Sequence, residues 1–253
     1  MKRLILSAAA VLFLAAGQAA ADGLPSRSKT KASVSDGRPC SLAAETGFSF
    51  ENATRGFGES NQPFSVEGGF MLTCGRFYAA VEGTSVSIEG ATAEVDLSMG
   101  IKPRTGPITW DLGLIFHAYN DAESLLNYLE LKAGASARIW KGGRLEGSAL
   151  YSPEYGGLVG TTQKAVGSAA WTLEGIFAQA LPDVGIFSPT ISGAIGQVNF
   201  EGSAADYVYW YVGVTLDFRE NWSVEIRYTD TDIAGGCGGV CDERVMASLR
   251  YAF

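Results

Sequence analysis

The last ten residues, 244–253, alternate strictly between two kinds of side chain. Those on one parity are apolar, namely Val245, Ala247, Leu249, Tyr251 and Phe253. Successive side chains of a β-strand point to opposite faces, so the pattern predicts a strand with one apolar and one polar face. An exported chain ending in such a strand, with an aromatic last residue, is typical of an outer-membrane β-barrel. An edge strand of a soluble sandwich is the alternative.

Residues 1–21 have the features of a secretory signal peptide. Lys2 and Arg3 precede an apolar run over residues 4–16, and three alanines (19–21) form a small-residue cleavage site before Asp22. The apolar run is shorter than the ~20 residues of a membrane-spanning helix, and no later segment approaches that length. If the protein crosses a membrane, it therefore crosses with strands.

Cleavage after residue 21 leaves an acidic chain. Without Lys2 and Arg3 there are 17 basic residues against 27 acidic ones, a net charge of −10. Phosphate binding needs clustered lysines and arginines, so nucleic acid is excluded as a partner. The 32 glycines and 11% aromatic residues suit a chain of many short strands, in a barrel or a soluble β-protein alike. No cofactor is expected.

Four cysteines in an exported chain predict two disulfides, because the periplasm is oxidising. Cys237 and Cys241 are separated by three residues and are expected to pair within one loop, which leaves Cys40 with Cys74. A metal site at Cys237 and Cys241 is disfavoured because no histidine lies near them in the sequence.

Residues 22–41 lack periodicity and are expected to be a flexible periplasmic leader, followed by a transmembrane β-barrel over residues 42–253. The fold class is therefore all-β, a single antiparallel up-and-down barrel of about twelve strands, most of them near the ~9–11 residues that cross a bilayer. The parity changes near Ser85, which indicates a bulge or the start of a loop. The expected strands are residues 42–51, 64–73, 76–84, 92–102, 108–119, 128–140, 144–151, 165–180, 190–200, 207–218, 222–229 and 244–253.

An even number of strands places both chain ends on the same side of the membrane, the periplasm. Cys40 and Cys74 then share the periplasmic rim, while Cys237 and Cys241 lie in an outer loop. The connections on the periplasmic side are mostly short, and most outer ones are longer, as transmembrane barrels require. Both observations favour a barrel over a sandwich.

The polar parity carries the charged residues. Inside a soluble core each would cost several kcal/mol, whereas a water-filled lumen would keep them hydrated. Glu45 shares this parity, and the acids outnumber the bases. The residues predicted to line the lumen are Glu67, Glu82, Glu94, Asp96, Lys102, Asp111, His117, Glu130, Lys132, Arg138, Arg144, Glu146, Glu174, Tyr209, Tyr211, Asp217, Glu225, Arg227, Arg244 and Arg250. Tyr207, Tyr209 and Tyr211 form an aromatic track or only fill space.

Several short motifs carry a resemblance to a known family. They are Thr54-Arg55-Gly56-Phe57, Gly75-Arg76-Phe77-Tyr78-Ala79, Tyr151-Ser152-Pro153-Glu154-Tyr155, Tyr228-Thr229-Asp230-Thr231-Asp232, Asp242-Glu243-Arg244-Val245 and the closing Phe253. With these motifs the chain resembles the family of Gram-negative outer-membrane β-barrel proteins known as TorF-type porins. The resemblance spans roughly residues 40–253 and implies a small barrel of the porin type, without indicating a substrate. The cysteine loop at 237–241 is not part of it.

An outer-membrane enzyme is the competing class, and its base would have to be His117, the chain's only histidine. Tyr119 stands where a serine would complete a His-x-Ser pair, and Asp111 is too far along the strand to orient the ring. No catalytic or metal-binding residue is therefore predicted. The acidic residues around the cysteine loop could bind a divalent cation, but a solvated loop is the preferred interpretation. These residues are Asp230, Asp232, Asp242 and Glu243.

The sequence thus favours an outer-membrane channel, not an enzyme, for passive diffusion of small hydrophilic solutes through a charged lumen. The alternative is a narrow or plugged barrel with a structural or surface-interaction role and no conductance. The expected partners are membrane lipid and lipopolysaccharide, small solutes, and the barrel-assembly machinery, which would recognise the strand ending in Phe253.

Overall fold

The computed structural model describes residues 40–58, 64–88, 90–120, 127–155, 158–159, 163–164, 168–202, 205–234 and 239–253. No helix in these ranges is long and apolar enough to cross a membrane. The long elements are strands β1 (Cys40–Phe50), β4 (Ser65–Cys74), β5 (Phe77–Ile88), β6 (Ala91–Ile101), β8 (Ile108–Tyr119), β9 (Tyr128–Trp140), β10 (Gly143–Tyr155), β13 (Ser168–Ala180), β14 (Ser188–Glu201), β15 (Tyr207–Phe218), β16 (Trp222–Thr231) and β17 (Arg244–Ala252).

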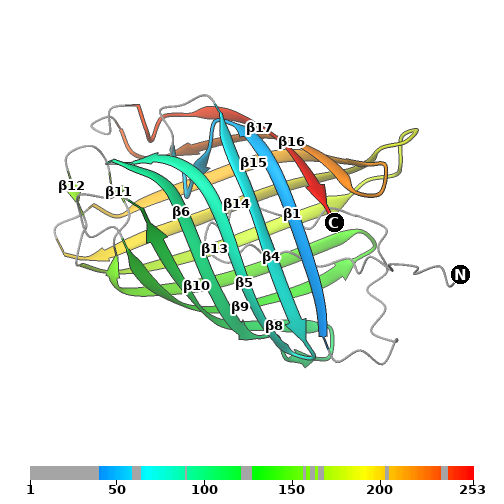
Figure 1. The fold of residues 1–253 in the computed structure, drawn as a ribbon, viewed down its shortest axis with the longest axis horizontal. Helices are drawn as coiled ribbons and strands as arrows, with labels where there is room; N and C mark the ends of the chain where they lie inside the picture. The colour runs from blue at the N-terminus through cyan, green and yellow to red at the C-terminus, as the bar shows by residue number, and fades with distance from the viewer. Residues whose placement is uncertain are drawn as a thin grey trace, which may run out of the picture.

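These twelve strands form a closed antiparallel barrel, which confirms the predicted fold class (Figure 1). Each long strand pairs with the next one in the sequence, and β1 pairs with β17 to close the sheet. Closure gives both edges of every long strand a hydrogen-bonded neighbour. Three short pairings accompany the barrel: β7 (Arg104–Thr105) with β8, β2 (Ala53–Thr54) with β3 (Phe57–Gly58), and β11 (Leu158–Val159) with β12 (Gln163–Lys164).

The two ends of the barrel differ in their connections. The terminal end holds Cys40 and Phe253, and its turns are short at residues 75–76, 141–142 and 219–221 and longer at 102–107 and 181–187. The loop end is the opposite one, where β1 finishes at Phe50 and β17 begins at Arg244. Most of the longer connections lie at the loop end, as predicted.

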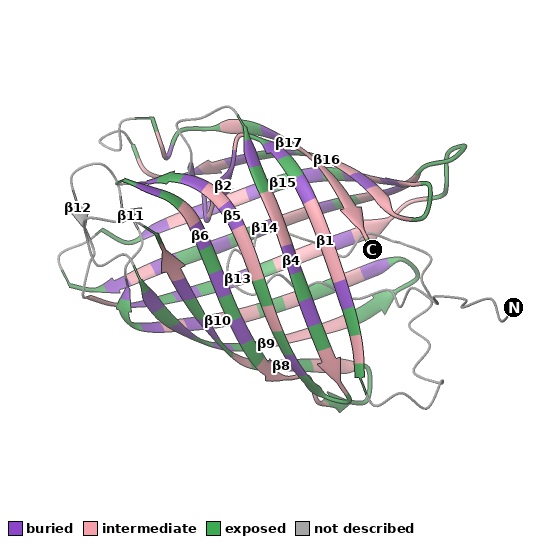
Figure 2. Ribbon diagram, in the orientation of Figure 1, coloured by how far each residue is buried: buried purple, intermediate pink, exposed green. Residues whose placement is uncertain are grey.

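Burial alternates along the strands with period two (Figure 2). On β6, Leu97 is 49% exposed, whereas its neighbours Asp96 and Ser98 are buried. Many exposed residues of the other strands are also large and apolar, and they surround the barrel, among them Leu72, Val81, Leu112, Leu131, Leu173, Val214, Ile226 and Val245. So much exposed apolar surface is what lipid, rather than water, would cover.

Aromatic side chains gather at both ends of this apolar band. Near the terminal end, the Tyr251 ring lies 4.8 Å from Trp222 and 4.9 Å from Phe253. Near the loop end, Phe48 stacks on Phe64 with ring centres 5.5 Å apart. Girdles of aromatic residues at both interfaces are typical of transmembrane barrels.

Strand existence and parity agree with the predictions, while some boundaries differ. The predicted irregularity near Ser85 is confirmed, since the β5–β6 register shifts between Ser85 and Ile88. Strand β10 continues to Tyr155, four residues beyond its predicted end, despite Pro153. Strand β14, expected over residues 190–200, is 14 residues long, and its neighbours on both sides pair with it along its length.

The predicted Cys40–Cys74 disulfide is confirmed, and it joins directly paired residues of β1 and β4 at the terminal end. Cys40 and Ser41 therefore belong to the first strand and not to the leader. Cys237 lies outside the described residues, so its bond with Cys241 stays a prediction. The signal peptide and the rest of the leader, residues 1–39, also lie outside them.

We expect replacement of Cys40 and Cys74 by serine to destabilise the barrel without changing its fold. The bond spans 34 residues of sequence, and loop-closure entropy gives it a contribution of up to roughly 4 kcal/mol. Unfolding by urea, followed by the mobility shift of the folded barrel in unheated detergent gels, would measure the loss. The neighbouring substitution Thr73→Ala is the control. An unchanged midpoint in the serine variant would contradict the expectation.

Candidate functional site

The charged residues predicted to line the lumen all have the inward parity. Most of them are satisfied by contacts with other side chains and not by water. They lie close together across strands as ion pairs and hydrogen bonds, and many are buried. Arg138 is the exception, because it is exposed near the terminal end of β9. The predicted hydration of the inner face is thus replaced over much of the lumen by pairing between side chains.

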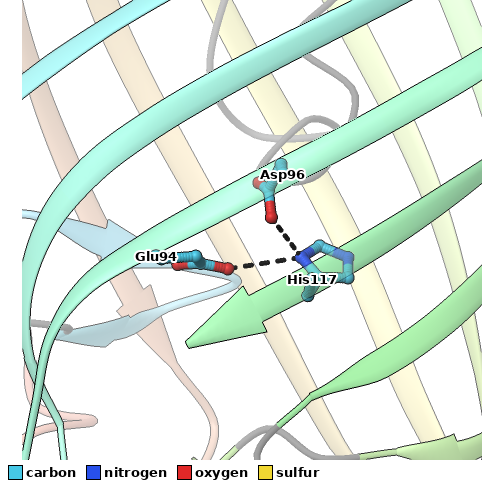
Figure 3. Close-up of side chains that lie close together, drawn as sticks. All are labelled: Glu94, Asp96 and His117. Atoms are coloured by element: carbon cyan, nitrogen blue, oxygen red, sulfur yellow. Dashed lines mark hydrogen bonds and ion pairs between the residues drawn. The ribbon is translucent and has the colours of Figure 1, made fainter. Parts of the chain in front are cut away.

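His117 occupies the centre of a buried ionic cluster toward the loop end. The β6–β8 register places Asp96 directly opposite His117, with Glu94 two residues away on the same strand. His117 Nδ1 lies 2.8 Å from Asp96 Oδ1 and 3.2 Å from Glu94 Oε1 (Figure 3). Tyr119 donates a 2.7 Å hydrogen bond to the same Glu94 oxygen.

The other face of the cluster is formed by β9. Glu130 Oε2 lies 3.2 Å from His117 Nε2, and the Tyr128 ring stacks on the imidazole at 4.2 Å. Both ring nitrogens of His117 therefore face carboxylates. Three carboxylates, Glu94, Asp96 and Glu130, converge on a single imidazole.

The cation that balances Glu130 comes from the short β2–β3 hairpin, residues 53–58, which folds against the inner face of the barrel. Arg55 is 2% exposed and donates two hydrogen bonds to Glu130, of 2.9 and 2.8 Å. Such a bidentate pair fixes both position and orientation of the guanidinium. Arg55 also has a positive φ of 49°, so the pair holds the hairpin turn in an uncommon backbone conformation.

An aromatic cluster fixes the same hairpin from its other side. The Phe57 ring packs edge-on against Tyr207 at 5.0 Å, and Tyr155 lies 4.9 Å from Tyr128 and 5.5 Å from Phe200. All five rings are buried in one apolar cluster of the described residues. Arg55 and Phe57 together occupy the lumen near the loop end.

A second polar group lies nearer the terminal end. Asp111 accepts a 3.0 Å hydrogen bond from the Tyr78 hydroxyl and lies 3.2 Å from Lys132 Nζ. Lys102 Nζ lies 4.4 Å from the centre of the Tyr78 ring. Gly113 makes room for that ring, since a Cβ at this inward position would collide with the Tyr78 hydroxyl.

A third group crosses β4, β16 and β17. Arg250 Nε donates a 2.6 Å hydrogen bond to Glu67 Oε1, and Arg250 Nη1 lies 3.4 Å from Glu225 Oε2. Glu225 also accepts from Arg227, whose guanidinium lies 4.2 Å from the centre of the Tyr211 ring. The space between these side chains is about 10 Å³, roughly one water molecule.

The remaining predicted residues make other contacts along the inner face. Arg144 and Glu146 pair at 2.8 Å along β10, and Tyr209 donates a 2.8 Å hydrogen bond to Glu174. Arg244 reaches the carbonyls of Gly239 and Val240 at the loop end. Glu82 is half-buried on β5, and Asp217 is buried on β15.

Sequence reasoning missed the hairpin residues that fold against the inner face of the barrel. Arg55 and Phe57 belong to a motif quoted for its resemblance, but nothing in the alternation of the strands indicates that this hairpin folds inward. Tyr78 was likewise quoted only as part of a motif, and its place on the inner face was not singled out. The inward glycine Gly113 is the signal that could have identified it, because a glycine inside a strand often marks a close approach.

Similarity to known proteins identifies the family of this chain. The sequence model of a family described as "Bacterial protein of unknown function (Gcw_chp)" matches residues 34–247. The chain belongs to the Gcw_chp family. The resemblance to TorF-type porins is not confirmed by this match, and no curated protein matches the sequence.

Solved outer-membrane porins are similar in fold. A KdgM porin has a TM-score of 0.56 at 8% identity, covering 83% of this chain and 99% of its own. A NanC porin has a TM-score of 0.51 at 10% identity, covering 84% and 98%. A KdgM porin in complex with disordered oligogalacturonate has a TM-score of 0.54 at 9% identity, covering 83% and 99%. At such identities the likeness establishes the porin-type barrel fold of this Gcw_chp member.

We expect Arg55→Met to cost about 3–5 kcal/mol of folding free energy, because Glu130 would then be left buried without its cation. Adding Glu130→Gln should recover much of that loss, since the uncompensated charge disappears. Urea unfolding of the two single variants and the double variant gives the coupling directly. Arg144→Met, in a less buried pair, should cost less. Additive losses in the double variant would contradict the pairing.

Proposed function

We propose that this protein is an outer-membrane channel of the porin type, passing small hydrophilic solutes through a charged lumen. The observation that carries the proposal is the closed twelve-stranded barrel with apolar side chains outside and ionic ones inside. The KdgM and NanC porins, with which it shares this fold, support the same class.

The proposal places the terminal end in the periplasm and the loop end outside the cell. The chain would be exported by a cleaved signal peptide, and the β17 strand ending near Phe253 would be recognised by the barrel-assembly machinery. Membrane lipid would cover the apolar band, and lipopolysaccharide would surround the loop end. The short turns at the terminal end support this orientation.

The β2–β3 hairpin folds against the inner face and restricts the lumen near the loop end. Arg55 and Phe57 lie inside the barrel. Glu130 binds Arg55, and the aromatic cluster packs around Phe57. In the conformation described, solutes would meet these side chains before the polar groups nearer the terminal end. Permeation therefore requires either very small solutes or movement of this hairpin.

A plugged barrel without conductance is the second candidate, and the same aromatic cluster favours it. Phe57, Tyr155 and Tyr207 are as buried as residues of a soluble core. A lumen closed by such packing would leave the outer loops to act in surface interactions. The conductance experiment below separates the two candidates.

The geometry of His117 does not support an enzymatic role. A general base needs one ring nitrogen directed at the proton that it removes from a nucleophile or water. Here Nδ1 faces Glu94 and Asp96, and Nε2 faces Glu130. We therefore assign no catalytic step to this histidine.

The charge of the inner face favours solutes that are not anionic. A KdgM porin has been solved with oligogalacturonate, whose repeating units carry carboxylates. In this chain the inward acids outnumber the inward bases, so a polyanion would meet net repulsion. We infer a preference for cationic, zwitterionic or neutral solutes.

We expect the purified protein to give small single-channel conductance steps in planar bilayers, and Arg55→Ala to raise their size several-fold. The substitution removes the ion pair that holds the hairpin against β9. Arg144→Ala, another inward arginine in an ion pair, is the control and should change the steps less. If neither the wild type nor Arg55→Ala conducts, the channel is wrong and the plugged barrel stands.

We expect the channel to prefer potassium over chloride, and Glu174→Gln to weaken that preference. Glu174 is an inward acid whose Oε1 atom has no hydrogen-bond partner in the part of the chain that the structure describes, and its other oxygen accepts from the neutral Tyr209 hydroxyl. Reversal potentials in a potassium chloride gradient measure the selectivity. Glu154→Gln, at an exposed position, is the matched control. A preference for chloride in the wild type would contradict the electrostatic argument.

A further inference from the structure

We propose that Glu94, Asp96 and His117 form a binding site for one divalent transition-metal ion, such as Zn²⁺, inside the barrel. Nothing in the sequence predicts this metal site, because the three residues lie on two strands and come together only through the β6–β8 register. Their ligand atoms all lie within 4.8 Å of one another. The inference concerns metal binding and does not depend on whether the barrel conducts.

The first argument is the crowding of carboxylates around one ring nitrogen. Nδ1 can carry one proton, so it can donate to only one of the two carboxylates that approach it. Its hydrogen bond goes to Glu94 Oε1, and Asp96 Oδ1 lies closer, at 2.8 Å, without the alignment of a hydrogen bond. A metal ion in place of that proton would bind the nitrogen and both carboxylates at once.

The second argument is an unsatisfied oxygen. Glu94 is 3% exposed, its carboxylate points toward the imidazole, and Oε2 has no hydrogen-bond partner among the described residues (Figure 3). A buried carboxylate oxygen without a donor costs free energy that coordination by a cation would remove. Among the described contacts, the cluster sets three carboxylates against one guanidinium and one imidazole, so a further positive charge would also balance it.

The third argument is the arrangement behind the histidine. A metal-binding imidazole usually donates its second ring N–H to a carboxylate, which fixes its tautomer and orientation. His117 Nε2 lies 3.2 Å from Glu130 Oε2, and Glu130 is itself held by two hydrogen bonds from Arg55. On the other side, Tyr119 holds Glu94 by its hydroxyl. Two of the three predicted ligands, His117 and Glu94, are thus oriented by a second layer of side chains.

The donor set selects the class of metal. Imidazole nitrogen with carboxylate oxygens suits Zn²⁺ and its neighbours in the first transition row, whereas Mg²⁺ and Ca²⁺ prefer oxygen alone. Ligand atoms of a tetrahedral zinc ion with bonds of ~2.1 Å are about 3.4 Å apart. The 2.8 and 3.2 Å separations around Nδ1 are close to that spacing. Three protein ligands leave one coordination position for water or a solute.

The test is titration of ZnCl₂ into the full-length protein, folded in detergent and stripped with a chelator. Isothermal calorimetry should give one bound ion per chain. His117→Ala and the nearly isosteric Glu94→Gln should abolish it. Asp111→Asn, a buried inward acid of the same strand β8, is the control and should retain it. The gel mobility shift of folded barrels establishes that each variant has folded.

A spectroscopic readout makes the assignment specific. Co²⁺ in place of zinc should give visible absorption typical of a low-coordinate nitrogen–oxygen site, and that absorption should disappear in Glu94→Gln. Glu130→Gln leaves all three ligands in place but weakens the contact that orients His117, together with the ion pair to Arg55. It should weaken Zn²⁺ affinity by roughly 10–100-fold while retaining the stoichiometry. Absence of stoichiometric binding by the wild type, or binding that survives both His117→Ala and Glu94→Gln, would overturn the proposal.

Discussion

Every backbone N–H and C=O group along the twelve strands must find its partner inside the sheet, because the hydrocarbon of a membrane offers none. The pairing of β1 with β17 meets that requirement, and it determines the rest of the structure. Closure turns the period-two alternation of each strand into two complete surfaces, one apolar and exposed, the other ionic and enclosed. The register of each pair then decides which inward side chains meet.

Enclosure creates a second constraint, since charges on the inner face have little access to bulk water. The chain satisfies it by joining inward acids and bases across strands. Lys132 meets Asp111 and Arg250 meets Glu67, while the hairpin brings Arg55 to Glu130. Removal of one partner leaves a buried charge, so these pairs are costly to break even where they add little net stability. The His117 cluster differs, because its carboxylates exceed its cations, and this excess underlies the proposed metal site.

The strands themselves could be predicted because alternation is a local property of the sequence. Residues 108–119 and 128–140 were predicted with the bounds of β8 and β9, and the inward parity of His117 and Glu130 followed. The contacts between strands could not be predicted in this way. Parity states that Asp96 and His117 share a face, but only the register of β6 against β8 makes them opposite neighbours. The inward path of Arg55 was also beyond the sequence, because it depends on Glu130, 75 residues away.

The central claim is that the apolar face of the closed sheet meets lipid while the other face is enclosed. Spin labels in reconstituted membranes test this claim at one outward-facing pair and one inward-facing pair of positions. Val81 and Leu97 are paired and point outward, and Ala80 and Ser98 are paired and point inward. The account predicts high accessibility to lipid-soluble oxygen and low accessibility to a water-soluble nickel chelate at Val81 and Leu97. It predicts a clear fall in oxygen accessibility at Ala80 and Ser98. Equal accessibility at all four positions, or ready access of the nickel chelate to Val81 and Leu97, would contradict it.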